Sequence, residues 1–143
     1  MKIKIDSELS WLTAYLKRIS RIINLGKIKT IQSVKYDKKV NRGSYAECVK
    51  YENETQYHVK LDQNYQVYRH HRDGTWSVKL KPHSKIDILC LLAHELAHTG
   101  LWNHDHSPDH KLLEARITTS FMKQLNRENY KNEEDELKTK DVL

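Results

Sequence analysis

The sequence predicts a small α+β fold, because segments with helical periodicity and segments with strand periodicity occupy separate parts of the chain. A helical stretch comes first, short strand-like segments follow, and two further helical stretches complete the periodic part. With 143 residues, the chain is long enough to enclose one hydrophobic core. We therefore expect an N-terminal helix, a small antiparallel sheet, a helix that contains His94-Glu-Leu-Ala-His98, and a second C-terminal helix.

The first helix is expected over about residues 7–25. Apolar side chains recur there every three or four positions, which places them on one face of a helix: Leu9, Leu12, Leu16, Ile19 and Ile23. Gly26 then provides the residue type that commonly ends a helix.

Short strands are predicted after this helix, because β-branched and aromatic residues alternate with turn-forming ones. Their approximate bounds are residues 28–40, 45–51, 57–61 and 65–68. Asp73-Gly74 predicts a tight hairpin turn. Trp76, Val78 and Leu80 alternate after that turn and indicate one more strand.

Two helices are predicted in the second half of the chain. Ser84 can cap the first of them, with Asp87 in the place of the usual glutamate of a capping box, and Gly100 can end it. Ser107-Pro108 is a typical start for the second helix, whose apolar side continues to Leu125. We assign residues 1–126 to a single domain and residues 127–143, which are charged and weakly periodic, to a frayed or disordered tail.

The motif His94-Glu-Leu-Ala-His98 indicates a zinc site. Histidines four residues apart on a helix project from the same face, one turn apart, and can bind one Zn²⁺ together. Glu95 lies beside the first histidine, where its carboxylate can reach a metal-bound water and act as general base and acid. These residues predict a zinc-dependent hydrolase.

A catalytic zinc site requires a third protein ligand and one open position. The candidates that follow the motif are His104, Asp105, His106, Asp109, His110 and Glu114. We favour His106, because it immediately precedes the Ser107-Pro108 helix start, which would hold it in place. His104 is the alternate third ligand, at the spacing that metzincin-like proteins use. His110 is expected to pack against the ligands or to orient one of them.

The segment from residue 84 to residue 121 resembles the small WLM, SprT-like and YgjP-type metallopeptidases. The resemblance lies in Ala93-His-Glu-Leu-Ala-His98 and in His106-Ser-Pro-Asp-His110, although His110 stands where those families usually have an aromatic residue. It implies a minimal zincin-like fold, a single zinc ion and the hydrolysis of peptide bonds, in some relatives on proteins crosslinked to DNA. It also implies that an edge strand pairs with an extended substrate, and residues 75–81, just before the motif helix, are the expected strand.

The charge of the chain is unevenly distributed. Residues 1–50 carry twelve Lys and Arg against four Asp and Glu, whereas the remainder has a net charge of −2. This basic third could contact DNA or a DNA-bound protein, but we favour a solvated surface, because no aromatic-basic motif accompanies it. Cys48 and Cys90 are expected to be reduced and buried. No apolar run reaches membrane-spanning length and no export signal is evident, so we expect no membrane partner and a cytoplasmic location, or a nuclear one in a eukaryote.

Two other functions are compatible with these residues. One is a nucleic-acid-binding module in which the zinc is structural, and the other is a zinc amidohydrolase that acts on something other than a peptide. A structural site has no use for Glu95, which favours the enzyme. A narrow closed pocket would indicate the amidohydrolase, and an open groove beside an edge strand would indicate the peptidase. We expect a protein or peptide substrate.

Overall fold

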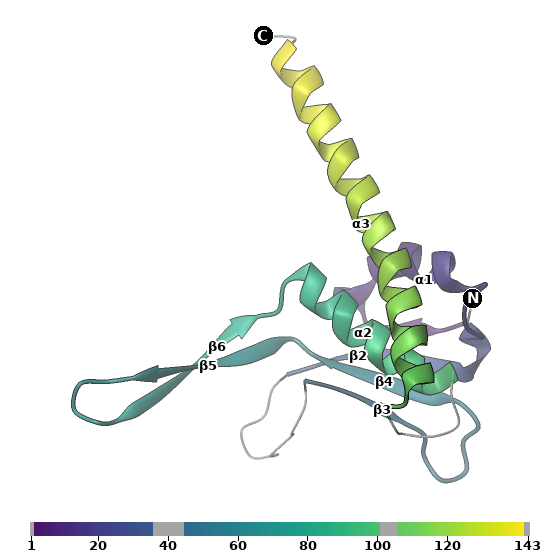
Figure 1. The fold of residues 1–143 in the computed structure, drawn as a ribbon, viewed down its shortest axis with the longest axis horizontal. Coiled ribbons are helices and arrows are strands. Elements are labelled where there is room, and N and C mark those ends of the chain that lie inside the picture. Colours follow the sequence, from purple (N-terminus) through teal and green to yellow (C-terminus); the bar gives the residue numbers. More distant parts are fainter. Residues whose placement is uncertain (1, 36–44, 101–105, 142–143) are drawn as a thin grey trace.

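The computed structural model describes residues 2–35, 45–100 and 106–141, and their arrangement confirms the α+β class (Figure 1). Four strands form the main sheet, in the order β1-β2-β4-β3. Their bounds are Lys4–Ile5 for β1, Ile28–Val34 for β2, Ala46–Val49 for β3 and Tyr57–Asp62 for β4. The sheet is mixed: β1, β2 and β4 are parallel, and β3 is antiparallel to β4. Within this sheet the expected antiparallel pairing is therefore present only between β3 and β4, and β2 and β4 are parallel neighbours.

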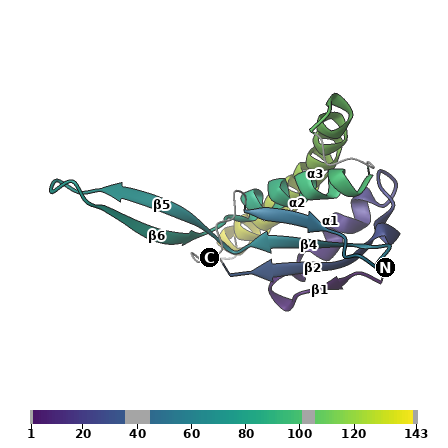
Figure 2. The same ribbon diagram turned by 90° about the horizontal axis from the view of Figure 1, so that it is seen from below.

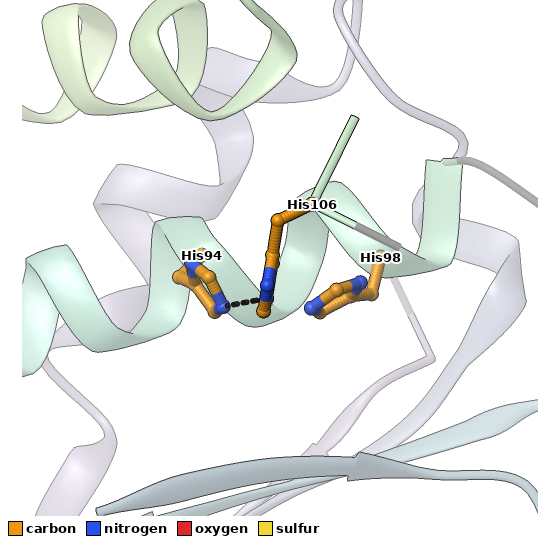
Figure 3. A group of neighbouring side chains, drawn as sticks. All are labelled: His94, His98 and His106. Atoms are coloured by element: carbon orange, nitrogen blue, oxygen red, sulfur yellow. Dashed lines mark hydrogen bonds between the residues drawn. The ribbon is translucent and has the colours of Figure 1, made fainter. Parts of the chain in front are cut away.

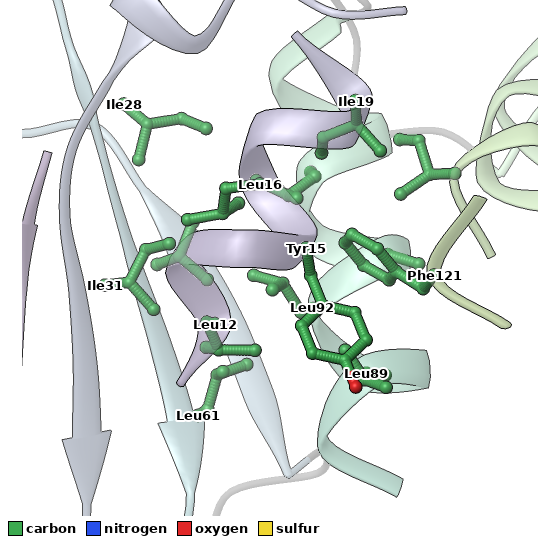
Figure 4. Packing of buried hydrophobic residues seen from close by; sticks show 14 of the residues in the cluster. Leu12, Tyr15, Leu16, Ile19, Ile28, Ile31, Leu61, Leu89, Leu92 and Phe121 are labelled. Atoms are coloured by element: carbon green, nitrogen blue, oxygen red, sulfur yellow. The ribbon is translucent and has the colours of Figure 1, made fainter. Parts of the chain in front are cut away.

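Three helices pack with this sheet around one core (Figures 1 and 2). They are α1 (Leu12–Ile19), α2 (Lys85–Gly100) and α3 (Pro108–Asp141). Figure 4 shows Ile31 and Leu61 of the sheet directed toward α1, with Leu92 of α2 and Phe121 of α3 completing the cluster. All four side chains are at most 1% exposed, so each excludes water from the others.

The first helix is shorter than expected. A 3₁₀ turn, Ser7–Leu9, precedes α1, and a second one, Leu25–Lys27, follows a set of turns. The side-chain oxygen of Asn24 accepts a hydrogen bond from the backbone N–H of Gly26 at 2.9 Å, which stabilises a turn in place of further helix. The predicted apolar face is nevertheless buried throughout: Leu9, Leu12, Leu16, Ile19 and Ile23.

Strands β5 (Asn64–His70) and β6 (Trp76–Pro82) form a separate two-stranded ribbon that projects from the body (Figures 1 and 2). The expected turn is present at its tip. The N–H of His71 donates to the carbonyl of Thr75 at 2.8 Å, and Gly74 has a φ of 86°. That conformation is accessible to glycine at little cost, which accounts for Asp73-Gly74 at this position.

Helix α3 continues well beyond the predicted end of the domain. Residues 127–141, which we expected to form a frayed or disordered tail, are its second half. Helix-forming glutamate and lysine residues are frequent in that segment, so intrinsic propensity favours a helix although the apolar side chains Tyr130 and Leu137 are exposed. Glu128 also accepts hydrogen bonds from Tyr15 at 2.5 Å and Lys85 at 2.9 Å, which connects α3 to α1 and α2. Within the described residues, none of the helices combines the length and apolar character that crossing a membrane requires.

Candidate metal centre

The motif helix α2 is held at its start by the predicted capping box. The N–H of Asp87 donates to Ser84 Oγ at 3.1 Å, and the N–H of Ser84 donates to Asp87 Oδ2 at 3.3 Å. Along the helix, Leu89, Leu92 and Leu96 are fully buried. This burial anchors one side of α2 in the core and turns the side with the histidines toward a pocket.

His94 and His98 on α2 and His106, just before α3, converge on one point (Figure 3). The Nε2 atoms of His94 and His106 are 3.0 Å apart. One ligand atom from each of the three residues lies within 4.8 Å of the others. Two nitrogens on one tetrahedral zinc are about 3.3 Å apart when each Zn–N bond is about 2.0–2.1 Å. The trio therefore has a spacing that could hold one metal ion.

Glu114 on α3 determines which nitrogen of His94 is available. Its Oε1 lies 2.5 Å from His94 Nδ1. A carboxylate can only accept a hydrogen bond from this ring, so in the neutral imidazole Nδ1 carries the proton and Nε2 keeps its lone pair. Nε2 is also the atom that faces His106. The carboxylate thus orients the imidazole as partners of metal-bound histidines usually do.

His110 joins the cluster from the first turn of α3 and is only 1% exposed. Its backbone N–H donates to Ser107 Oγ at 3.2 Å, which confirms the predicted helix cap. Its Nε2 donates to the backbone carbonyl of His94 at 3.1 Å. Burial is the main reason that the pKa of His110 is lowered, which favours the neutral form of the ring. These contacts agree with a packing and orienting role, although His94, His110 and Glu114 also form a second group with metal-ligand spacing.

Glu95 lies on the wall of the same pocket and is 7% exposed. Burial raises the pKa of its carboxyl group, and the carboxylates of Glu47 and Glu114 raise it further, while His94 lowers it. Among the described residues, Glu95 belongs to neither of the two groups of side chains whose spacing could hold a metal ion. Its position beside the histidines fits a group that handles a proton.

The pocket has a volume of about 820 Å³ and extends from the histidines along α2. One wall is β3, through Ala46, Glu47 and Cys48. At the other end, the ring of His83 lies between Tyr45 and Tyr65, with centroids 5.2 Å from each. Sequence analysis did not select these three residues, because nothing in their local pattern relates the ends of distant strands to α2.

The strand that lines the pocket is not the one expected from the sequence. Residues 75–81 belong largely to β6, which pairs with β5 in the projecting ribbon rather than lying beside the histidines. The strand at the pocket is β3, one of the two outer strands of the main sheet in the described chain. Trp76, a candidate for the cleft, is 65% exposed on the ribbon. Trp102, the alternate ligand His104 and Asp105 lie outside the described residues.

No protein-family model, curated protein or solved structure matches the chain. Any conclusion about function therefore rests on the chain's own residues and on their arrangement.

The two cysteines are free thiols, as expected, but they are less buried than predicted. Cys48 on β3 is half-buried and Cys90 on α2 is exposed, and both line the pocket. Burial, followed by the charge of Glu95, raises the pKa of Cys48 to about 12. The thiol of Cys48 is therefore protonated at neutral pH and contributes apolar surface to the pocket.

Proposed function

We propose that this protein is a zinc-dependent hydrolase that cleaves peptide bonds. The observation that carries the proposal is the convergence of three histidines and a buried glutamate in a pocket beside an outer strand. Three imidazoles are a ligand set that suits zinc, and they leave a fourth position for water or substrate.

His94, His98 and His106 would hold the ion, and Glu114 would keep His94 in the correct orientation. Zinc, when bound, lowers the pKa of a water molecule and polarises the carbonyl group under attack. Glu95 would accept the proton of the attacking water and then pass it to the leaving nitrogen. This exchange needs a carboxylate close to the metal ligands but not among them, which is where Glu95 lies.

The surroundings of the histidines favour a polypeptide substrate. Strand β3 forms a wall of the pocket, and among the described strands it pairs only with β4, at one end of the main sheet. A strand at the end of a sheet is the kind of strand that pairs with an extended peptide through backbone hydrogen bonds. A pocket of about 820 Å³ that follows this strand accommodates several residues of such a peptide. A small non-peptide amide would have no use for the strand.

The test compares Glu95→Gln with the wild-type protein. The variant keeps the size of the side chain, so it should fold and bind zinc as the wild type does. Hydrolysis of an unfolded protein substrate, or of a mixed peptide library, should fall by about 10²–10⁴-fold. Glu133→Gln, which makes the same change at an exposed position of α3, is the matched control and should keep full activity.

The outcomes separate the competing functions. Zinc-dependent cleavage that Glu95→Gln leaves unchanged would show that the proton is handled elsewhere. Tight zinc binding with four protein ligands and no cleavage of any peptide in the library would indicate a structural site. Cleavage of small amides but not of peptides would indicate the amidohydrolase.

A further inference from the structure

The ribbon formed by β5 and β6 has no role in the core. It projects away from the sheet and the helices (Figures 1 and 2), and none of residues 64–82 is fully buried. A two-stranded ribbon that buries no apolar face receives little stabilisation from packing. Packing in the core therefore does not account for the length and composition of the ribbon.

The register of the ribbon separates two kinds of side chain. Residues directly opposite each other in an antiparallel pair project from the same face. One face, here called the aromatic face, carries the pairs Gln66–Leu80, Tyr68–Val78 and His70–Trp76. The other, here called the basic face, carries the pairs Tyr65–Lys81, Val67–Lys79 and Arg69–Ser77. Tyr68, His70 and Trp76 thus lie on one face, and the cationic groups lie on the other, with Tyr65 at its base.

The aromatic face is open to solvent. Trp76 is 65% exposed and Tyr68 is 61% exposed. The ring of His70 lies with its centroid 4.6 Å from that of Trp76, which holds the indole in place without covering it. Large exposed rings that lie next to each other commonly mark a binding surface.

The basic face makes the ribbon a cationic arm. Residues 64–82 contain four Lys and Arg and a single acid, Asp73, which gives a net charge of +3. The carboxylate of Asp73 is occupied within the turn, where it accepts from the N–H of Thr75 at 2.9 Å and from its hydroxyl at 2.6 Å. No other carboxylate on the ribbon balances the cationic groups.

We propose that the ribbon binds single-stranded nucleic acid, with unpaired bases stacked on Trp76 and Tyr68 and phosphates beside Lys79, Lys81 and Arg69. Stacking platforms next to cationic groups are what single strands require. A single strand is flexible enough to reach both faces of a narrow ribbon. A duplex is stiff and keeps its bases stacked inside, so it could use only the basic face.

The base of the ribbon borders the pocket that contains the histidines. Tyr65, at the base of the basic face, also lines the pocket that contains the histidines. A strand bound along the ribbon would therefore lead toward that pocket. The inference does not depend on the proposed hydrolase, because binding requires neither the metal nor cleavage.

The experiment measures the fluorescence anisotropy of a labelled oligothymidylate with the full chain over a series of salt concentrations. Trp76→Ala should weaken binding by about 5- to 150-fold, the loss of one stacked base, while Trp76→Phe keeps most of the affinity. Replacing Lys79 and Lys81 together by Gln should reduce the slope of log affinity against log salt by about 1.4. Circular dichroism checks that each variant is folded.

The matched control replaces Lys2 and Lys4 by Gln, which removes the same charge from exposed positions of the basic N-terminal third. It should change the affinity much less than the ribbon variant does. An equal loss in this control would place the contact at the N-terminus and overturn the proposal. So would equal affinity for a duplex together with no effect of Trp76→Ala. The wild type could instead fail to bind the oligonucleotide and form a dimer that Trp76→Ala dissociates. That result would mean that the ribbon binds a second copy of the chain.

Discussion

Replacing Glu114 by Ala should weaken zinc binding without abolishing it. Glu114 Oε1 lies 2.5 Å from His94 Nδ1 and holds the ring with Nε2 toward the other ligands. Without this carboxylate, His94 can rotate or place its proton on Nε2, and both changes must be reversed before the ion binds. Removal of such a partner typically costs about 10- to 100-fold in metal affinity.

The amide of Glu114→Gln can still accept a hydrogen bond from Nδ1, so this variant should retain more affinity than Glu114→Ala. Glu133→Ala, at an exposed position of the same helix, is the control and should bind zinc as the wild type does. The dissociation constants would be measured by competition with a chromophoric chelator.

Two results would refute this reasoning. If Glu114→Ala binds zinc as tightly as the wild type, the hydrogen bond to His94 does not matter for the metal. If the variant loses zinc as completely as His94→Ala does, Glu114 is itself a ligand. In that case the second group, His94, His110 and Glu114, would be the true site.

Three further predictions concern the ligand set and the stability of the fold. His106→Ala should reduce zinc affinity far more than His104→Ala or His110→Ala; a larger loss for His104→Ala in the same competition assay would reassign the ligand. Phe121→Ala should lower the free energy of unfolding in urea by about 3–5 kcal/mol, because the ring is fully buried between α1 and α2; a loss below about 1 kcal/mol would contradict this packing. Burial alone would raise the pKa of Glu128, but hydrogen bonds from Tyr15, Lys85 and Gln124 lower it below its ordinary value of 4.5. A lowered pKa stabilises the fold above pH 4.5 and loses that effect as the pH falls through the folded-state pKa. The stability difference between wild type and Glu128→Gln should therefore shrink on acidification, and a constant difference from pH 7 to pH 3 would be inconsistent with that contact.

Local patterns alone predicted most of the elements and part of the site. The capping residues Ser84, Asp87 and Ser107 act through neighbours within one turn, so their roles could be read from the order of residues. The same holds for Asp73-Gly74, whose turn depends on the backbone freedom of Gly74. Spacing on one helix likewise placed His94 and His98 on a common face.

Only the tertiary structure determined the features that depend on contacts between distant segments of the chain. The partnership of Glu114 with His94, the pocket wall at β3 and the Tyr45–His83–Tyr65 cluster each join elements that are far apart in sequence. The position of the edge strand was of the same kind: alternation after the Asp73-Gly74 turn identified residues 75–81 as a strand, but it could not say which strand would line the pocket. Several strands compete to place their apolar faces in the core, and the outcome determines which strands pair. The residues of one strand alone do not reveal that outcome.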